Sequence, residues 1–540
     1  MVTPSGGAKD VLPPVPLKAF PPSYSIDFKG KSIKIDFNEY VKITDAASQL
    51  VVSPFMKITP ELKLRGKSVI VDFTDTLKPN TTYTVSFGNA ISDITENNIL
   101  SNYKYIFSTG NVIDSLMLKG SVKNAFTLKP ESGLLVMLYE HTEDSVPCKE
   151  TPLYITKTNE SGNFSMANIR NGKYKIFALR DMNSNYLFDQ PNEKIAFVDS
   201  LVFPELVDTA KIDTVKKDSI IKNRTLLYGI DLYLFEEIAS TQRLLKAFAA
   251  QYGKLVFTFR KPVQNVSFKL LSENITEPWN LQEINITKDT VILWMKNPDT
   301  DSLTLQISDN NVILDTAEIT PLKKDASKNK GNRGNNYKNI QLKINASGRS
   351  AFDFYKSLTI ESSTPLALAD FNKIILKENK DTIKTTFLFT DSLKRFMRMD
   401  YKWKEGTAYS IFIPPCTFKD IFGLPNDTTK IDFKTSALKD YGNIKMKLKS
   451  NALNKLVIQL VTENDVILQE KYSTANEIVK FDYVLPGNYK IKAICDANGN
   501  KKWDTGDYFK KILPEKIYYY PSAIQIRSNW DMDMDWEITK

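Results

Sequence analysis

The chain contains the stretch GKYKIFALRDMNSNYLFD (Gly172–Asp189) and, 315 residues later, the stretch GNYKIKAICDANGNKKWD (Gly487–Asp504). The glycine, the tyrosine, the first aspartate, both asparagines and the last aspartate keep the same spacing in the two copies. In each copy the residues before the first aspartate read as a strand that leads into a loop. This agreement indicates an internal duplication, which favours a modular β protein over one catalytic domain.

The composition is that of ordinary globular domains, with 42% hydrophobic and 25% charged residues. A length of 540 residues should correspond to roughly three to five domains. Short alternating runs rich in Thr, Tyr, Phe, Ile and Val are broken about every eight to twelve residues by Asn, Gly or Pro, as in sandwiches of short strands. We therefore predict an all-β chain of tandem β-sandwich domains in an extended multi-domain arrangement.

Two segments, 13–110 and 340–437, share a series of short motifs. In the first segment, strands are expected at 32–37, 69–73 and 83–87, because apolar residues alternate there. The pattern Tyr-x-hydrophobic, then Asp-hydrophobic, then Phe-x-Thr resembles the bacterial Ig-like domain family (SbsA type) of envelope and surface-layer proteins, which implies an Ig-like sandwich in each segment. The matched residues are Thr81 and Thr407, Tyr83 and Tyr409, Asp93 and Asp420, Phe107 and Phe433, and Thr109 and Thr435.

A module with one Asp/Asn loop follows each Ig-like segment, at 112–205 and at 440–540. A Gly-x-Tyr motif before a strand that ends in an Asp-x-Asn-x-Asn loop resembles the prealbumin-like or carboxypeptidase-regulatory-like sandwich. Residues 225–322 are expected to form a third, divergent β-sandwich, in which 236–250 fits either a helix or a β-hairpin. The remaining segments are interpreted as a flexible N-terminal tether (1–12) and a basic flexible linker (323–338).

The Asp/Asn loops are the candidate metal sites. Calcium takes six to eight oxygen ligands, and the loops offer side-chain oxygens at relative positions one, three, five and nine. Both loops depart from the EF-hand pattern, because position six holds Tyr186 or Lys501 where that pattern needs glycine. In the alternative interpretation, Asp and Asn side chains cap the loop's own backbone amides. The sequence leaves both open, and a bound Ca²⁺ would stiffen the loop rather than catalyse. The candidate ligands are Asp181, Asn183, Asn185 and Asp189 in the first loop and Asp496, Asn498, Asn500, Asp504 and Asp507 in the second.

The C-terminal run 530–537 alternates Trp or Met with Asp or Glu, so its acids share one face of a strand. We interpret this acidic row as the solvated face of a final strand whose charges discourage edge-to-edge aggregation, with cation recruitment as the alternative.

No motif for catalysis is recognisable. The single histidine, His141, lies in a polar stretch that reads as a surface loop, and neither a nucleophile elbow nor a phosphate-binding glycine loop occurs. We therefore expect a protein that is not an enzyme. Scattered tryptophans (Trp279, Trp294 and Trp403) could stack on sugars but are expected to belong to the core.

The net charge of +9 is spread along the chain except in the linker, and neither a basic helix nor an aromatic RNA-binding signature accompanies it. Nucleic-acid binding is therefore not expected. The three cysteines form no disulfide framework and no Cys-x-x-Cys pair.

The polar opening residues, together with the Ig-like and prealbumin-like modules, resemble envelope lipoproteins of the Bacteroidota. The resemblance implies an outer-membrane lipoprotein, on either the periplasmic or the surface face, whose lipid anchor is not present in this sequence. The expected function is non-catalytic binding or scaffolding, as an accessory subunit of a larger outer-membrane protein assembly. Outer-membrane or cell-surface proteins are the expected partners. Surface adhesion or glycan binding is the alternative.

Overall fold

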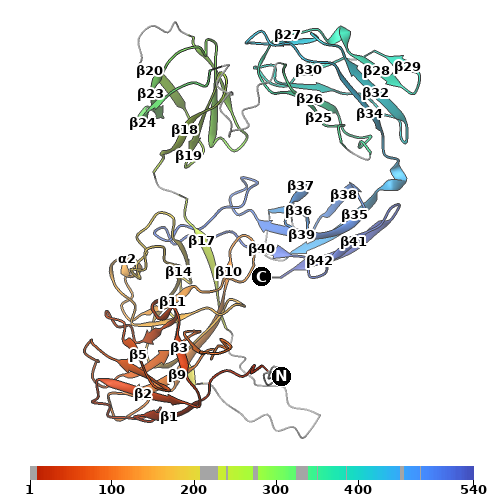
Figure 1. Ribbon diagram of the computed structural model, residues 1–540. Coiled ribbons are helices and arrows are strands. Elements are labelled where there is room, and N and C mark those ends of the chain that lie inside the picture. The colour runs from red at the N-terminus through yellow and green to blue at the C-terminus, as the bar shows by residue number, and fades with distance from the viewer. Residues whose placement is uncertain are drawn as a thin grey trace, which may run out of the picture. The chain divides into compact units, whose positions relative to one another are not determined.

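The computed structural model describes residues 9–206, 229–238, 241–271, 278–323, 339–348, 351–384, 386–450, 455–474 and 476–539. The chain forms two compact units, of which the first contains Met1–Ile238 and Ala493–Tyr518 and the second Ala239–Lys492 and Tyr519–Lys540. Strands dominate both units (Figure 1), which confirms the all-β prediction. Helical turns are short: α1 (Ala46–Gln49), α2 (Val146–Lys149), η2 (Phe371–Lys373) and η3 (Leu438–Asp440). Most of the expected tether (1–8) and linker (324–338) lies outside the described residues.

The first unit begins with an Ig-like sandwich. One sheet has the order β1-β2-β6-β5 and the other β4-β7-β9, and β3 pairs with β8. The expected strands at 32–37, 69–73 and 83–87 are confirmed as β2, β6 and β7, and Ile33, Ile35 and Phe107 are fully buried between the sheets. The strands are β1 (Pro16–Phe20), β2 (Ser32–Phe37), β3 (Val41–Ile43), β4 (Val51–Ser53), β5 (Glu61–Arg65), β6 (Ser68–Asp72), β7 (Thr82–Ser86), β8 (Ile91–Asp93) and β9 (Lys104–Ser108).

The segment predicted as the first prealbumin-like module follows, with the strand order β12-β11-β14-β15-β17-β10-β13 and with β16 paired to β10. Its last strand, β17, lies beyond the predicted end at residue 205 and inside the segment expected to form the middle sandwich. β17 runs parallel to β10 and antiparallel to β15, so hydrogen bonding assigns it to this module. The strands are β10 (Leu116–Asn124), β11 (Leu135–Tyr139), β12 (Tyr154–Lys157), β13 (Asn163–Ile169), β14 (Lys175–Arg180), β15 (Lys194–Phe197), β16 (Glu205–Leu206) and β17 (Ile230–Glu236).

The second unit begins with the middle sandwich, whose sheets have the orders β18-β19-β22-β21 and β20-β23-β24. β18 and β19 form an antiparallel hairpin that turns at Gly253, where φ is +71°. The hairpin interpretation is therefore right for the described part of 236–250, and the helix interpretation is wrong. The strands are β18 (Leu244–Gln251), β19 (Lys254–Phe259), β20 (Val266–Leu270), β21 (Asn280–Ile284), β22 (Thr290–Met295), β23 (Leu303–Asp309) and β24 (Val312–Ile319).

The segment predicted as the second Ig-like sandwich contains the sheets β25-β26-β31-β30 and β29-β28-β32-β34, and β27 pairs with β33. Its shared motifs make the same hydrogen bonds as in the first copy. The hydroxyl of Tyr83 accepts the amide of Lys78, and that of Tyr409 accepts the amide of Lys404. The strands are β25 (Leu342–Ile344), β26 (Leu358–Ser362), β27 (Leu366–Ala369), β28 (Ile375–Glu378), β29 (Asp381–Ile383), β30 (Leu388–Phe389), β31 (Phe396–Met399), β32 (Ala408–Ile413), β33 (Phe418–Asp420) and β34 (Thr429–Lys434).

A buried arginine joins the middle sandwich to the second Ig-like sandwich within this unit. Arg395 donates to the carbonyl of Ser362 (3.1 Å) and to the carboxylate of Glu283 (2.5 Å), and its guanidinium lies over the ring of Trp294 at 5.3 Å. The indole nitrogen of Trp294 donates to the other oxygen of Glu283. The buried guanidinium of Arg395 is therefore both paired with a carboxylate and hydrogen-bonded, as a buried charge requires.

The C-terminal strands form the sheets β38-β35-β42 and β37-β36-β39-β40, with β41 also paired to β39. The boundary between the two units falls within β39 and again within β40. The strands are β35 (Gly442–Ser450), β36 (Leu456–Thr462), β37 (Ile467–Ser473), β38 (Ile478–Val484), β39 (Gly487–Cys495), β40 (Ile517–Tyr519), β41 (Ile524–Ile526) and β42 (Asp531–Ile538).

The acidic row of β42 is exposed, as predicted, and a row of lysines lies beside it. β42 runs parallel to β35, and the register places Lys445 opposite Asp533 (3.9 Å), Lys447 opposite Asp535 and Lys449 opposite Glu537. Cross-strand pairs of opposite charge stabilise a sheet modestly. The register therefore places a lysine beside each of Asp533, Asp535 and Glu537.

Candidate functional site

The first Asp/Asn loop is organised by one carboxylate. Asp181 accepts the backbone amides of Asn183 (3.1 Å), Ser184 (2.7 Å) and Tyr186 (2.8 Å). The side-chain amides of Asn183 and Asn185 both donate to the carboxylate of Asp189. The four side chains predicted as calcium ligands therefore do lie together, in one hydrogen-bonded turn.

The second loop repeats this arrangement. Asp496 accepts the amides of Gly499, Asn500 and Lys501, and the side-chain amides of Asn498 and Asn500 both donate to one oxygen of Asp504. Asp507 does not join them. Its carboxylate binds Lys510 through the backbone amide (3.0 Å) and the ammonium (2.7 Å).

A glutamate completes each loop, and sequence reasoning missed this role. Glu193 is 1% exposed and accepts the amides of Met182, Asp189 and Gln190. Glu515 takes the same place in the second loop, where it accepts the amides of Ala497 and Asp504. Burial raises the pKa of Glu515, while these amide hydrogen bonds oppose the rise. The signal in the sequence was a glutamate shortly after the last aspartate of each copy.

The hydrogen bonds show what cation binding would require. In both loops the asparagine oxygens accept backbone amides, and the NH₂ groups converge on the last aspartate. Two side-chain N–H groups thus point at that carboxylate in each loop. The carboxamides would have to rotate before their oxygens could serve as calcium ligands. Calcium binding by these loops stays a prediction.

The second loop carries an insertion that the first lacks. Glu193 follows Asp189 by four positions, whereas Glu515 follows Asp504 by eleven. We call residues 505–511, which lie in this insertion, the plug. Within the first unit, the plug packs against the first prealbumin-like module.

Tyr508 is the centre of the plug. It is 4% exposed and belongs to the aromatic cluster on the outer side of β11, β14 and β15. Its ring makes edge-on contacts with Phe177 (5.4 Å), Phe188 (6.4 Å) and Phe197 (5.1 Å), and its hydroxyl donates to the carbonyl of Asp144. Burial raises the pKa of Tyr508, which therefore stays protonated and able to donate.

Polar contacts hold the rest of the plug. Thr505 donates to the carbonyl of Glu236 (2.7 Å), the amide of Tyr508 donates to the carboxylate of Glu237 (2.5 Å), and Lys511 pairs with Asp144 (2.9 Å). Gly506 lies against Phe235, and a Cβ at this position would come within 2.6 Å of that ring. The plug thus combines a buried aromatic anchor with a polar rim, as binding interfaces do.

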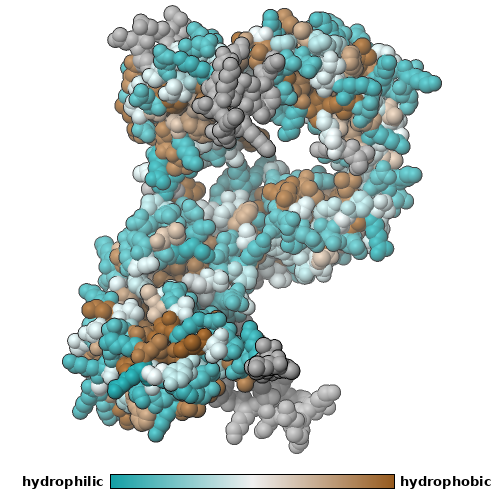
Figure 2. Space-filling view, viewed as in Figure 1, coloured by the Kyte–Doolittle hydropathy of each residue, from teal (hydrophilic) through white to brown (hydrophobic). Residues whose placement is uncertain are grey.

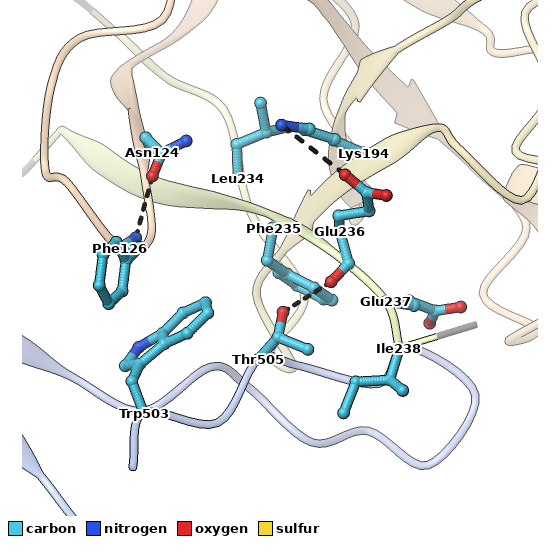
Figure 3. Close-up of a pocket in the computed structure, with 10 residues that line it drawn as sticks. All are labelled: Asn124, Phe126, Lys194, Leu234, Phe235, Glu236, Glu237, Ile238, Trp503 and Thr505. Atoms are coloured by element: carbon cyan, nitrogen blue, oxygen red, sulfur yellow. Dashed lines mark hydrogen bonds and ion pairs between the residues drawn. The ribbon is translucent and has the colours of Figure 1, made fainter. Parts of the chain in front are cut away.

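A cavity of about 380 Å³ lies beside the plug. Figure 3 shows Trp503 and Phe126 on one side, Glu236, Glu237 and Ile238 on the other, and Phe235 and Thr505 between them. The rings of Phe126 and Trp503 meet edge to face at 5.0 Å. Side chains from β10, β15, β17 and the second loop therefore share one hollow. The complete lining is Asn124, Phe126, Lys194, Leu234, Phe235, Glu236, Glu237, Ile238, Trp503 and Thr505.

The histidine and the tryptophans considered as functional candidates lie at the surface or in the cores. His141 is exposed beside Glu150, as predicted, and Trp279, Trp294 and Trp403 are buried in sandwich cores, as predicted. No cluster of three or more His, Cys, Asp or Glu side chains suited to a metal occurs among the described residues. Within the same part of the chain, none of the helices has the length and apolarity needed to cross a membrane.

Comparison with known proteins supports one module directly. Residues 10–109 match a family described as "Bacterial Ig-like domain", which confirms the resemblance predicted for the first sandwich. The second Ig-like assignment, at 340–437, continues to depend on the shared motifs and hydrogen bonds. No curated protein matches the chain.

Solved structures give distant similarities. One is BcpA, the major pilin subunit of Bacillus cereus, with a TM-score of 0.16 and 9% identity over 78% of this chain and 99% of that chain. Another is the S-layer protein rSbsC, with a TM-score of 0.14 and 12% identity over 95% of this chain and 67% of that chain. A third is alpha-2-macroglobulin from Escherichia coli, spanning domains MG0-NIE-MG1, with a TM-score of 0.19 and 12% identity over 47% of this chain and 93% of that chain. At these TM-scores the similarities carry no argument about function.

Proposed function

We propose that this chain is a non-catalytic binding and scaffold protein of the bacterial cell envelope. In its specific form, the protein is an outer-membrane lipoprotein that serves as an accessory subunit of a larger outer-membrane assembly. The match of residues 10–109 to a bacterial Ig-like domain supports a modular sandwich protein of this class. Contacts within each unit suit a scaffold: Arg395 pairs with Glu283 in the second unit, and Tyr508 lies in an aromatic cluster of the first unit.

The observation that carries the proposal is an apolar sheet edge. β37 is an end strand of its sheet, and at or beside it Val466, Ile467, Leu468 and Tyr472 are 58%, 49%, 47% and 53% exposed. Figure 2 shows apolar atoms on the surface in the region where Figure 1 labels β37. An end strand that carries exposed apolar side chains can pair with an edge of a partner's sheet.

The test is an affinity pull-down of the tagged, full-length lipidated protein from its native outer membrane in mild detergent, read by mass spectrometry. We expect a stoichiometric β-barrel or lipoprotein partner. Leu468→Lys on β37 should reduce recovery of that partner, whereas Val312→Lys, at a more exposed apolar position on β24 (62% against 47%), should not. Recovery of the protein alone, or equal recovery with both variants, would contradict the proposal.

A further inference from the structure

The cavity beside the plug has apolar walls that the proposed scaffold role leaves unused. Phe235 is 2% exposed and forms part of the floor, while Phe126 and Ile238 are 38% and 65% exposed at the rim. The indole nitrogen of Trp503 donates to the carbonyl of Glu515, which fixes the orientation of the ring. The hollow therefore offers aromatic surface in a fixed geometry, and this surface can cover an aliphatic chain.

The charges around the cavity are not balanced. Its lining carries two carboxylates, Glu236 and Glu237, and one ammonium group, that of Lys194. Lys194 lies 3.8 Å from Glu236, a loose pairing. Nearby, Asp507 and Lys510 neutralise each other at 2.7 Å. Among the described residues, Glu237 and Asp507 thus share Lys510, and these three groups together carry one net negative charge.

Glu237 is the group that a cation would meet. One of its oxygens accepts the amide of Tyr508, and Figure 3 places the side chain at the edge of the hollow. Burial raises the pKa of Glu237, with Lys510 opposing the rise. A positive ligand would relieve this desolvation cost, whereas an anionic ligand would increase it.

We propose that this cavity binds the side chain of a lysine presented by a partner protein, a proposal that rests on the scaffold function above. The four-carbon stem of lysine packs against Phe126 and Trp503, and the ammonium group reaches the carboxylates of Glu236 and Glu237. Lysine side chains bury their stems along apolar surface while the charge stays near polar groups. An ammonium group near aromatic faces also gains cation–π attraction.

The site is composite, which links lysine binding to the plug. Trp503 and Thr505 come from the second loop, and the other lining residues come from the first prealbumin-like module. A ligand that touches both parts favours the docked state of the plug.

The first experiment titrates the full chain with Nα-acetyl-lysine methylamide and with its norleucine counterpart, which lacks the ammonium group. Binding is followed by ligand-observed NMR. We expect a dissociation constant on the order of millimolar for the lysine probe, because so small a ligand makes few contacts. The norleucine probe should bind at least about tenfold more weakly, as one lost charge interaction implies. Equal binding of the two probes, or no binding of the lysine probe at about 50 mM, overturns the proposal.

Variants locate the binding. Glu237→Gln keeps an oxygen for the amide of Tyr508 but removes the charge, so it should weaken the lysine probe about tenfold. Glu160→Gln, at an exposed turn of the same module, should change nothing. An unchanged affinity in Glu237→Gln overturns the assignment to this cavity.

The link to a partner is tested separately. Glu237→Gln should reduce recovery of the partner in the pull-down, and unchanged recovery overturns the role of a partner lysine here. If the unmodified protein captures no partner, the proposed function fails, while the titration still decides the chemistry of the cavity.

Discussion

Replacing Tyr508 by alanine should release the plug. Deleting a buried aromatic side chain costs about 3–5 kcal/mol, and Tyr508 is 4% exposed among Phe177, Phe188 and Phe197. The hydroxyl bond to the carbonyl of Asp144 contributes about 1 kcal/mol of this, so Tyr508→Phe should cost only about that amount.

Hydrogen exchange of residues 505–512 is the suitable assay, because local opening and global unfolding are separate events in a chain of two units. Three amides report on the plug: Tyr508 donates to Glu237, Lys511 to the carbonyl of Tyr508, and Ile512 to the carbonyl of Asp507. Since 1.4 kcal/mol corresponds to a factor of ten, Tyr508→Ala should accelerate their exchange by roughly 100- to 5,000-fold. Tyr508→Phe should accelerate it about fivefold.

Phe509 provides the matched control. It is the next residue, it is also aromatic, and it is 64% exposed. Phe509→Ala should leave the exchange of these amides nearly unchanged, because little surface is lost from the interior. Equal acceleration by Phe509→Ala and Tyr508→Ala would refute the idea that burial of Tyr508 holds the plug.

Three further predictions concern other parts of the chain. Arg395→Ala should destabilise the second unit by about 3 kcal/mol, because it leaves the partly buried carboxylate of Glu283, 19% exposed, without its partner. Leu245→Ala, at a 49% exposed position of β18, is the control, and equal shifts in thermal unfolding would contradict a stabilising role of Arg395. The calcium hypothesis predicts that EDTA lowers the melting temperature of the full chain and that added Ca²⁺ restores it, whereas an unchanged transition leaves the self-capped turn as the explanation. Burial lowers the pKa of Lys492 to about 8, so the folded state binds fewer protons than the unfolded state above that pH, and stability should rise as the pH is raised from about 8 towards 10.5. Lys492→Met should remove this rise in pH-dependent denaturation, and a rise that persists would show that another group causes it.

The parts of the fold that sequence predicted were those governed by local periodicity. The alternation of Ile33, Ile35 and Phe37 places every second side chain in the core, and β2 follows from it. The segment 236–250 was ambiguous because Leu, Ala and Phe in β18 suit a helix as well as a strand. This segment is a strand because the chain turns at Gly253 and β18 pairs with β19. Such pairing depends on residues outside the local pattern.

In the candidate site, too, local features could be predicted from the sequence and long-range contacts could not. The spacing of the Asp/Asn loops correctly brought Asp181, Asn183, Asn185 and Asp189 together, because the turn is local. Asp507 was predicted in the second set, but it lies in the insertion after Asp504 and its carboxylate binds Lys510. Tyr508 was missed because its aromatic partners, Phe177, Phe188 and Phe197, lie more than 300 residues earlier in the chain and meet it only through tertiary packing.

The division of the chain between the two units also affects its biosynthesis. Residues 493–518 complete the aromatic cluster of the first unit, yet the ribosome makes them only after nearly all of the second unit. Until then the surface that receives Tyr508, which includes Phe177 and Phe197, remains uncovered on the nascent chain. Exposed apolar surface of this kind promotes aggregation and chaperone binding. A truncation at residue 492 should therefore give a first unit that is prone to aggregation and proteolysis, although the whole of Met1–Ile238 is present.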